Sequence, residues 1–381
     1  MVLGLVVLVI VLSLIAGDGG DDGSAPDTTT PTTRPSATST TLPRSSSSSA
    51  PILADGEALD PSFDMALVSF RSNGTVVVAD LGTGHEHVLE DRVPLAPIQA
   101  VSWIGSTFVA RSVGRELHRL VPGTPNDWEI VDTLGLGADP YWPGPSGLVY
   151  LWDPADLNVS GMRFGVVEPT GGLRLLDGPA SVFLGTPVGL LGDSAVFNTG
   201  DGVYLLGPDQ QPRRHAYGTV LGVGGDRMVR RSCDELLECR LLLEEPATGT
   251  VVDLGRLDPD AFIVTASPSP DGQAVALVAA TSDELSVRIL PVRPTRALTW
   301  VIGPRWSEPQ MLQWSGDGNG LVWLDVDQRQ VRSIRWRGAE PSAEPAVARL
   351  EPLPPTASFE ANFLVPAAAL PPGWSPRATV N

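Results

Sequence analysis

The chain has 381 residues, of which 42% are apolar and 18% are charged, and its formal net charge is −18. A surface this acidic is repelled by nucleic-acid phosphates and by anionic membrane leaflets, which argues against a nucleic-acid partner. All basic residues are arginine, which excludes chemistry that needs a lysine, such as a Schiff base or the lysine of a phosphate-binding loop.

Residues 2–16 form the first predicted element, an apolar run interrupted only by Gly4 and Ser13. As a helix it would span about 22 Å, against about 30 Å for the hydrocarbon core of a bilayer. A cleaved signal peptide should begin with basic residues and end in an A-x-A-like site, and the sequence has neither. We therefore predict that residues 1–17 are an uncleaved, single-pass signal anchor in the cytoplasmic membrane. A start codon further upstream would supply the missing length and positive charge.

A low-complexity segment, residues 18–52, follows the predicted anchor. It runs from Asp-Gly repeats through Thr-Pro repeats to the serine run at 45–49. Such a composition cannot bury enough apolar surface to offset the entropy lost when a chain is ordered. We predict a disordered stalk that carries the rest of the chain on the extracytoplasmic side of the membrane.

One pattern returns through residues 53–352: an apolar strand, a turn with Gly and Asp, and a second apolar strand. The residues that stand just before these turns are Trp103, Trp142, Leu190, Val223, Pro268 and Trp314. They are separated by roughly 33 to 48 residues, and a period of about 40–50 residues is typical of one four-stranded propeller blade.

A second pattern, Asp/Glu-x-x-Thr-Gly or a close variant, recurs between later strands of the same repeats. It stands at residues 80–84, 168–172 and 245–249, and its glycine supplies the positive φ that a tight hairpin turn needs. The first repeat shows only this second pattern. Counting that repeat, we predict an all-β fold, a single β-propeller of seven four-stranded blades, preceded by the transmembrane helix. The predicted blades span residues 62–95, 96–136, 137–180, 181–218, 219–258, 259–306 and 307–352.

The last segment, residues 353–381, is a tail rich in Pro and Ala. Its apolar stretch 358–365 has the composition of a strand that could close the ring beside the first blade. This closure would explain why the first blade lacks the first pattern. The sequence leaves the closure open, and with it a blade count between six and eight.

The segment Ser269-Pro270-Asp271-Gly272 is similar to the repeat motif of bacterial TolB-type propellers, also called WD40-like or PD40 repeats. Trp314-Ser315-Gly316-Asp317-Gly318 resembles the same motif with glycine in place of proline. The composition, rich in Arg, Ala, Gly and Pro, resembles that of high-GC actinobacterial proteins. The TolB resemblance implies a ring of blades that binds partners at the mouth of a central channel or on the loops of one face. It implies no specific role, because no TolB-like N-terminal domain precedes the repeats and propellers serve many functions.

Cys233 and Cys239 are the only cysteines, and they lie between two strands of the fifth predicted blade. A hairpin across this spacing brings the two Cα atoms within disulfide range. An even number of cysteines behind an N-terminal membrane signal favours a disulfide formed outside the cytoplasm. A zinc site would need two further ligands, which the neighbouring sequence does not offer.

Trp103, Trp142 and Trp314 share one position of the repeat. We expect them to pack between neighbouring blades, and the alternative is an aromatic rim that faces a sugar or a peptide. His85 and His87 form a His-x-His pair, for which solvated turn residues are favoured over metal ligands. We predict no catalytic residue, no metal and no cofactor, since the sequence contains no nucleophile-elbow, zinc-protease or P-loop motif.

These observations predict a non-catalytic interaction, scaffold or sensor domain at the cell envelope, with a protein or a cell-wall glycan as its partner. The alternative is an envelope hydrolase or lyase that acts on glycan or peptide at the mouth of the channel. Such an enzyme would need two or three carboxylates close to a histidine or an arginine in the channel.

Overall fold

The strands of this protein are short, and their burial follows their position in the sheets. β21 (Ala274–Ala280) and β25 (Gly320–Asp325) are buried at every residue, whereas β19 (Thr250–Arg256) is exposed or half-buried throughout. A strand reads as a continuous apolar run when both of its faces are covered, and it becomes polar where it lies open to water. The burial therefore places β21 and β25 between stacked sheets and β19 at an open edge.

A computed structural model describes residues 52–54, 57–60, 63–71, 75–89, 98–104, 107–112, 117–121, 127–130, 137–140, 148–152, 162–167, 173–176, 186–192, 194–207, 212–236, 238–256, 261–293, 297–304, 311–325, 328–337, 339, 343–352 and 360–376. They belong to one unit, Ser48–Asn381. The predicted anchor and the predicted stalk up to residue 51 lie outside the described residues. Within the described ranges no helix is long and apolar enough to cross a membrane.

The described strands form seven four-stranded antiparallel sheets. In spatial order the sheets are β28 (Glu360–Pro366), β1 (Met65–Arg71), β2 (Val76–Asp80) and β3 (Glu86–Leu89); β4 (Ile98–Ile104), β5 (Thr107–Ser112), β6 (Leu117–Leu120) and β7 (Trp128–Ile130); β8 (Gly137–Pro140), β9 (Leu148–Trp152), β10 (Met162–Val167) and β11 (Leu173–Leu176); β12 (Thr186–Leu191), β13 (Ser194–Thr199), β14 (Gly202–Leu206) and β15 (Pro212–Ala216); β16 (Thr219–Gly224), β17 (Arg227–Cys233), β18 (Cys239–Glu245) and β19; β20 (Phe262–Pro268), β21, β22 (Glu284–Pro291) and β23 (Leu298–Pro304); and β24 (Leu312–Trp314), β25, β26 (Gln330–Arg335) and β27 (Ala346–Arg349).

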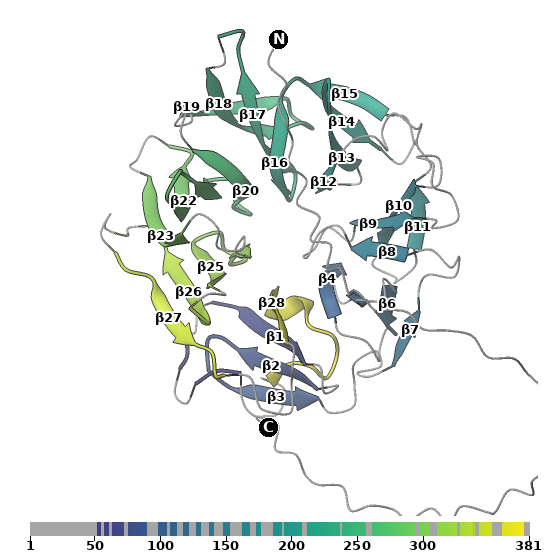
Figure 1. Ribbon diagram of the computed structural model, residues 1–381, viewed down its shortest axis with the longest axis vertical. Coiled ribbons are helices and arrows are strands. Elements are labelled where there is room, and N and C mark those ends of the chain that lie inside the picture. Colours follow the sequence, from purple (N-terminus) through teal and green to yellow (C-terminus); the bar gives the residue numbers. More distant parts are fainter. Residues whose placement is uncertain are drawn as a thin grey trace, which may run out of the picture. The chain divides into compact units, whose positions relative to one another are not determined.

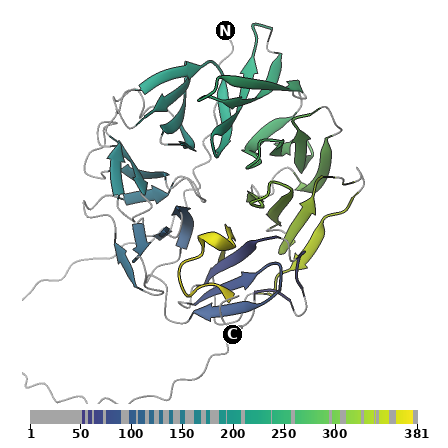
Figure 2. The same cartoon turned by 180° about the vertical axis from the view of Figure 1, so that it is seen from behind.

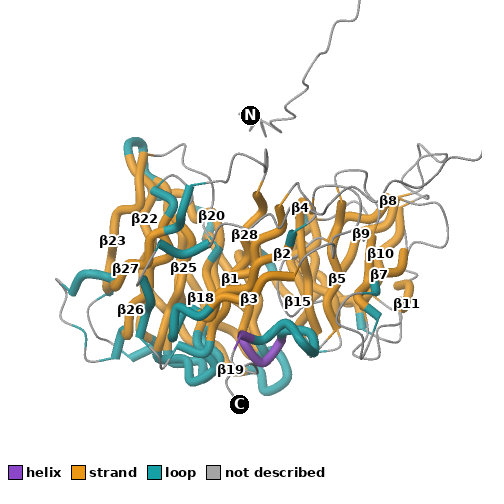
Figure 3. Tube along the Cα trace, turned by 90° about the horizontal axis from the view of Figure 1, so that it is seen from below, coloured by secondary structure: helices purple, strands orange, loops and turns teal. Residues whose placement is uncertain are grey.

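The sheets stand side by side around a ring, each as one blade of a β-propeller (Figure 1 and, from behind, Figure 2). The first strand of a blade, such as β16 or β20, lies on the inside of the ring, and the fourth strand, such as β15 or β19, lies on the outside. Seen from the side, the strands cross the thickness of the ring and the described loops lie on its two faces (Figure 3). Because four antiparallel strands return the chain to its starting direction, the first strands of successive blades begin at the same face.

The C-terminal part of the chain completes the first blade. β28 pairs with β1 along its whole length, from Met65 opposite Pro366 to Arg71 opposite Glu360. The stretch 358–365, which the sequence suggests as a closing strand, overlaps β28. The described part of the tail therefore supplies the closing strand, because β28 belongs to the sheet of the first blade.

The tail also contributes to the core beyond its strand. After the 3-10 helix η2 (Ala367–Ala369), Trp374 is fully buried. Its ring centre lies 5.4 Å from that of Phe108 and 6.3 Å from that of Phe70, in a cluster shared with the first two blades. Aromatic side chains supply much of the apolar area that a core buries, so the tail joins two blades from one face of the ring.

At the N-terminal side the propeller begins before residue 53. Ile52 and Leu53 are buried in a cluster shared by the first and last blades. Leu53 pairs with Leu350, and the Glu86 carboxylate accepts hydrogen bonds from the backbone N–H groups of Ile52 (2.8 Å) and Leu53 (2.6 Å). Burial raises the pKa of the Glu86 carboxyl above its usual value, although these N–H groups oppose the shift. Ile52 therefore belongs to the propeller and not to the stalk.

The inside strands β16 and β20 approach so closely that only glycine fits at one position. A Cβ atom on Gly222 would lie 1.7 Å from the carbonyl oxygen of Ala266. We expect Gly222→Ala to lower the free energy of unfolding by about 3 kcal/mol, since one strand must move away from the other. Gly316→Ala is the matched control: a Cβ atom there meets nothing within 4 Å, and the change should be below about 0.5 kcal/mol. Urea denaturation compares the two variants, and equal stabilities would show that the strands separate without cost.

Candidate functional site

Exposed apolar side chains gather around one blade. In the described part of the chain five large hydrophobic residues are exposed, and four of them lie between residues 217 and 262. The four are Tyr217 (73% exposed), Leu236 (82%), Val251 (55%) and Phe262 (61%). Single exposed apolar side chains are common, whereas exposed apolar side chains that lie close together mark a candidate surface for another molecule. The blade β16–β19 is therefore the candidate binding region.

Three of these side chains lie at the same face of the ring, two on this blade and one on the next. Tyr217 stands just before β16, and the loop that holds Leu236 follows β17 at the end where β16 begins. Phe262 is the first residue of β20, which begins at the same face as β16. Tyr217, Leu236 and Phe262 therefore share one face of the ring.

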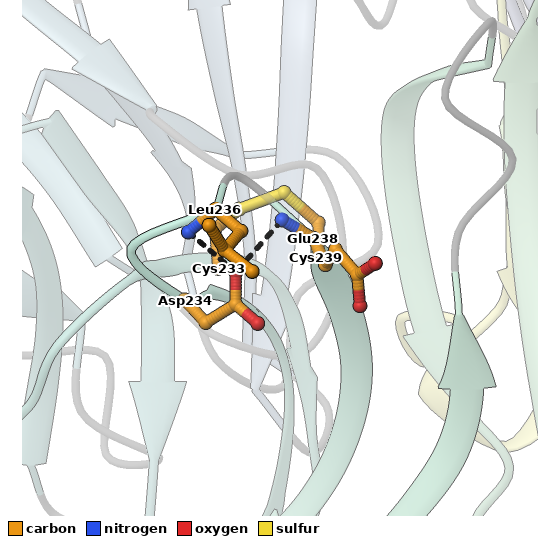
Figure 4. The surroundings of a disulfide bond; sticks show 5 residues. All are labelled: Cys233, Asp234, Leu236, Glu238 and Cys239. Carbon is orange, nitrogen blue, oxygen red and sulfur yellow. Dashed lines mark hydrogen bonds between the residues drawn. A yellow bond between two sulfur atoms is a disulfide. The ribbon is translucent and has the colours of Figure 1, made fainter.

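The loop between β17 and β18 is closed by a disulfide between Cys233 and Cys239 (Figure 4), which confirms the pairing predicted from the sequence. The two cysteines are the last antiparallel pair of the hairpin. Within the loop one carboxylate oxygen of Asp234 accepts hydrogen bonds from the backbone N–H groups of Leu236 and Glu238, both at 2.9 Å. A cross-link and two local hydrogen bonds thus hold the backbone that carries Leu236.

A buried ion pair supports the turn at Tyr217. Arg230 and Glu244 are both buried, and Arg230 Nε donates to Glu244 Oε1 at 3.0 Å. A second guanidinium nitrogen donates to the same carboxylate oxygen, and the third donates to the backbone carbonyl of Tyr217. His215 Nε2 lies 3.3 Å from the other carboxylate oxygen. Both oxygens of Glu244 thus have partners, and the group is placed to hold structure and not to act as a free general base.

The side chain of Tyr217 is also fixed from its solvent side. The guanidinium carbon of Arg214 lies 3.8 Å from the centre of the Tyr217 ring, which is a cation–π contact. The next residue, Gly218, has a φ of +105°, and a Cβ atom there would lie 2.2 Å from the carbonyl oxygen of Arg231. Only glycine permits this backbone, so the turn presents Tyr217 in a defined position.

A shallow pocket of about 270 Å³ opens beside the ion pair. It is lined by His215 and Ala216 of β15, Arg230 of β17, and Glu244, Glu245, Pro246, Gly249, Thr250 and Val251 of the β18–β19 hairpin. Small-molecule sites usually measure about 300–1,000 Å³ and are mostly apolar. This pocket is smaller and its ionic groups pair with one another, so it is better suited to be part of a contact surface than to hold a small molecule.

The described residues place the two neighbouring histidines apart from any metal-binding group. His85 is exposed and precedes β3, whereas His87 lies within β3 opposite Val78. In the part of the chain that the structure describes, no three His, Cys, Asp or Glu side chains come together to hold a metal ion.

Trp314 packs between two blades. It is buried, and its indole N–H donates to the carbonyl oxygen of Ser267 in β20 of the neighbouring blade at 3.0 Å. The alternative of a ligand-facing aromatic is therefore wrong for Trp314, because the neighbouring blade covers its ring. Trp103 lies in β4, where the structure describes its backbone and not its side chain. Trp142 lies outside the described residues.

The two Ser-x-Asp-Gly turns use their carboxylates for structure. Ser315 Oγ donates to Asp317 at 2.5 Å, and this hydrogen bond holds the pKa of the Asp317 carboxyl below its usual range. Asp317 also pairs with Arg335 at 3.6 Å. In the other turn, Asp271 pairs with Arg337 of the next blade. Neither carboxylate is part of the acid–base pair that the alternative enzyme would need.

Sequence reasoning missed Tyr217, Leu236, Val251 and Phe262 as candidate binding residues. A signal for Leu236 was present, because it lies among acidic residues between two cysteines of a hairpin, where a loop must be exposed. The other three stand next to ordinary strands, and nothing in their local sequence separates them from core residues.

The comparisons with known proteins concern the fold. No model of a known protein family matches the chain, and no curated protein matches it in sequence. Among solved structures it is similar to TolB from Acinetobacter baumannii, with 15% identity and a TM-score of 0.41, over 76% of this chain and 64% of TolB. It is also similar to a prolyl endopeptidase (15% identity, TM-score 0.48, 76% of this chain and 51% of that one) and to a puromycin hydrolase (14%, 0.48, 82% and 57%). The chain thus spans less than two thirds of each of these proteins, and the likeness concerns the fold alone.

Proposed function

We propose that this chain is a membrane-anchored, extracytoplasmic β-propeller that acts as a non-catalytic interaction domain, as a scaffold or a sensor at the cell envelope. Residues 1–17 anchor it, and residues 18–51 form a stalk between the membrane and the propeller. Its partner is a protein or a cell-wall glycan.

The location is supported by three features of the chain. Residues 2–16 are an apolar run, and the segment after them has the composition of a flexible stalk. The third feature is the disulfide Cys233–Cys239, because such bonds persist outside the reducing cytoplasm.

The binding role is carried by the exposed apolar side chains of one blade. Tyr217 and Leu236 lie at one face of the blade β16–β19, Phe262 lies at the same face at the start of the next blade, and the buried pair of Arg230 and Glu244 holds the turn of Tyr217 in place. Exposed apolar patches mark candidate interaction sites, and aromatic side chains such as Tyr217 and Phe262 are enriched at the core of protein interfaces. Glu244 and Glu245 do lie near His215 and Arg230, but on strands outside the innermost strand of the blade and not at the channel, so this group does not favour the alternative hydrolase or lyase.

Fractionation of cells that express the full chain tests the location. We expect the chain in the membrane fraction after a high-salt wash, and we expect protease added to intact spheroplasts to digest the propeller. A variant that lacks residues 2–16 should leave the membrane fraction. A chain found in the cytosol with free thiols at Cys233 and Cys239 would overturn the proposal.

Retention of a partner tests the binding role. Detergent-solubilised envelopes should yield a partner that stays with the full chain and is lost from the variant Tyr217→Ser/Phe262→Ser. Val347→Ser is the matched control, because Val347 is exposed on β27 of another blade and should have no effect. Equal retention by all three proteins would show that the blade β16–β19 is not the binding surface.

A further inference from the structure

We propose that the loop Cys233–Cys239, called the Leu236 loop below, docks into a protein partner that offers an apolar pocket bordered by arginine or lysine side chains. Leu236 fills the pocket, and the carboxylates of the loop meet the basic border. This inference rests on the proposed function and adds to it a contact residue and a class of partner.

Leu236 is the most exposed large apolar side chain of the described residues. It stands at the tip of the β17–β18 hairpin, beyond the disulfide (Figure 4). A leucine in this position leaves water only when another molecule covers it, and that transfer favours association. A protruding tip buries most area in a concave site, so the matching surface is a pocket.

The described residues of the Leu236 loop are held in place before they meet a partner. The disulfide closes the loop, and the Asp234 carboxylate accepts hydrogen bonds from the backbone N–H groups of Leu236 and Glu238. Association is opposed by the entropy lost when contact groups are ordered, and a preformed loop avoids much of that loss.

Carboxylates surround Leu236 and favour a partner pocket that has positive charge at its border. Asp234, Glu235 and Glu238 are exposed, and one cation, Arg256, pairs with Glu238 at 2.7 Å. The tip therefore keeps a net negative charge. A basic border attracts it, whereas an anionic lipid leaflet repels it. A glycan is disfavoured as well, because residues 233–239 contain no aromatic ring on which a sugar could stack.

Photo-cross-linking in cells that make the full chain tests the proposal. A benzophenone amino acid replaces Leu236 in one variant and Val347 in the matched control. We expect position 236 to give one protein adduct that position 347 does not give. The cross-linked peptide, identified by mass spectrometry, should carry apolar residues beside Arg or Lys. The yield should fall at least fivefold with Glu235→Arg and stay within twofold with Glu344→Arg, another exposed carboxylate.

Binding to the purified partner gives the second measurement. Leu236→Ser should weaken binding at least tenfold, and Val347→Ser less than twofold. An intact disulfide and an unchanged melting temperature show that the loop variant folds as the parent does.

The remaining outcomes separate this inference from the proposed function. An adduct with lipid, with peptidoglycan or with a second copy of this chain would overturn the inference, as would an adduct that Glu235→Arg leaves unchanged. If position 236 gives no adduct while the full chain still retains a partner, the Leu236 loop is not the docking site and the proposed function stands. If the chain retains no partner at all, both fail.

Discussion

Removal of residues 356–381 is expected to lower the melting temperature of the propeller by more than about 10 °C, or to abolish its cooperative unfolding. β28 supplies a strand of the first blade, and without it β1 loses one neighbour along its whole length. The deletion also removes Leu364, Val365 and Trp374, all fully buried. Because β1 is buried at every residue, its freed edge would expose apolar surface and unpaired backbone groups.

Thermal denaturation followed by circular dichroism measures this effect. Removal of residues 377–381 alone, which lie outside the described residues, is the control and should leave the melting temperature within about 2 °C. Trp374→Ala removes the tryptophan side chain and keeps β28, so it measures the contribution of the side chain by itself. It should lower the free energy of unfolding by about 3–5 kcal/mol, because the ring packs against Phe70, Phe108 and Trp128. An unchanged melting temperature after the large deletion would mean that β28 does not hold the ring closed.

The blades could be predicted from the sequence because their turns are local structures. Ser269-Pro270-Asp271-Gly272 connects β20 to β21, and its serine hydroxyl donates to its own aspartate at 2.7 Å. A turn that is held by its own side chains needs no distant residue, so its sequence is enough to identify it. The predicted limits of the fifth blade, 219–258, accordingly lie close to those of β16–β19, 219–256.

The features that the sequence left open depend on distant partners. The apolar run of β28 fits many positions, and only its pairing with β1 places it in the first blade. Ile52 follows a polar segment, yet its side chain is buried in the apolar cluster of the first and last blades, and its N–H group donates to Glu86 of β3. The exposure of Tyr217 also depends on the arrangement of the whole ring, since the turn between β15 and β16 lies at a face of the ring and leaves the side chain uncovered.

Arg230→Met is expected to lower the free energy of unfolding by about 3–5 kcal/mol. The substitution leaves the Glu244 carboxylate buried without its strongest partner, and an uncompensated buried charge is far more costly than a broken surface pair. Arg240→Met is the matched control on the neighbouring strand. Its ion pair with Asp253 is about half exposed on both sides, so its loss should change stability by less than about 1 kcal/mol.

The double variant Arg230→Met/Glu244→Leu separates the net contribution of the ion pair to stability from the cost of leaving one buried charge unpaired. Both buried charges are then absent, and apolar side chains of similar size should recover most of the stability that the single variant loses. Urea denaturation of the parent, of Arg230→Met, of Glu244→Leu and of the double variant gives the coupling energy between the two positions. The double variant still lacks the donor to the backbone carbonyl of Tyr217, so it should fold stably and yet retain less partner than the parent. Full retention by the double variant would show that Arg230 contributes to stability and not to partner binding. A double variant whose loss of stability equals the sum of the two single losses would show that the two positions are not coupled, and would contradict the expected recovery.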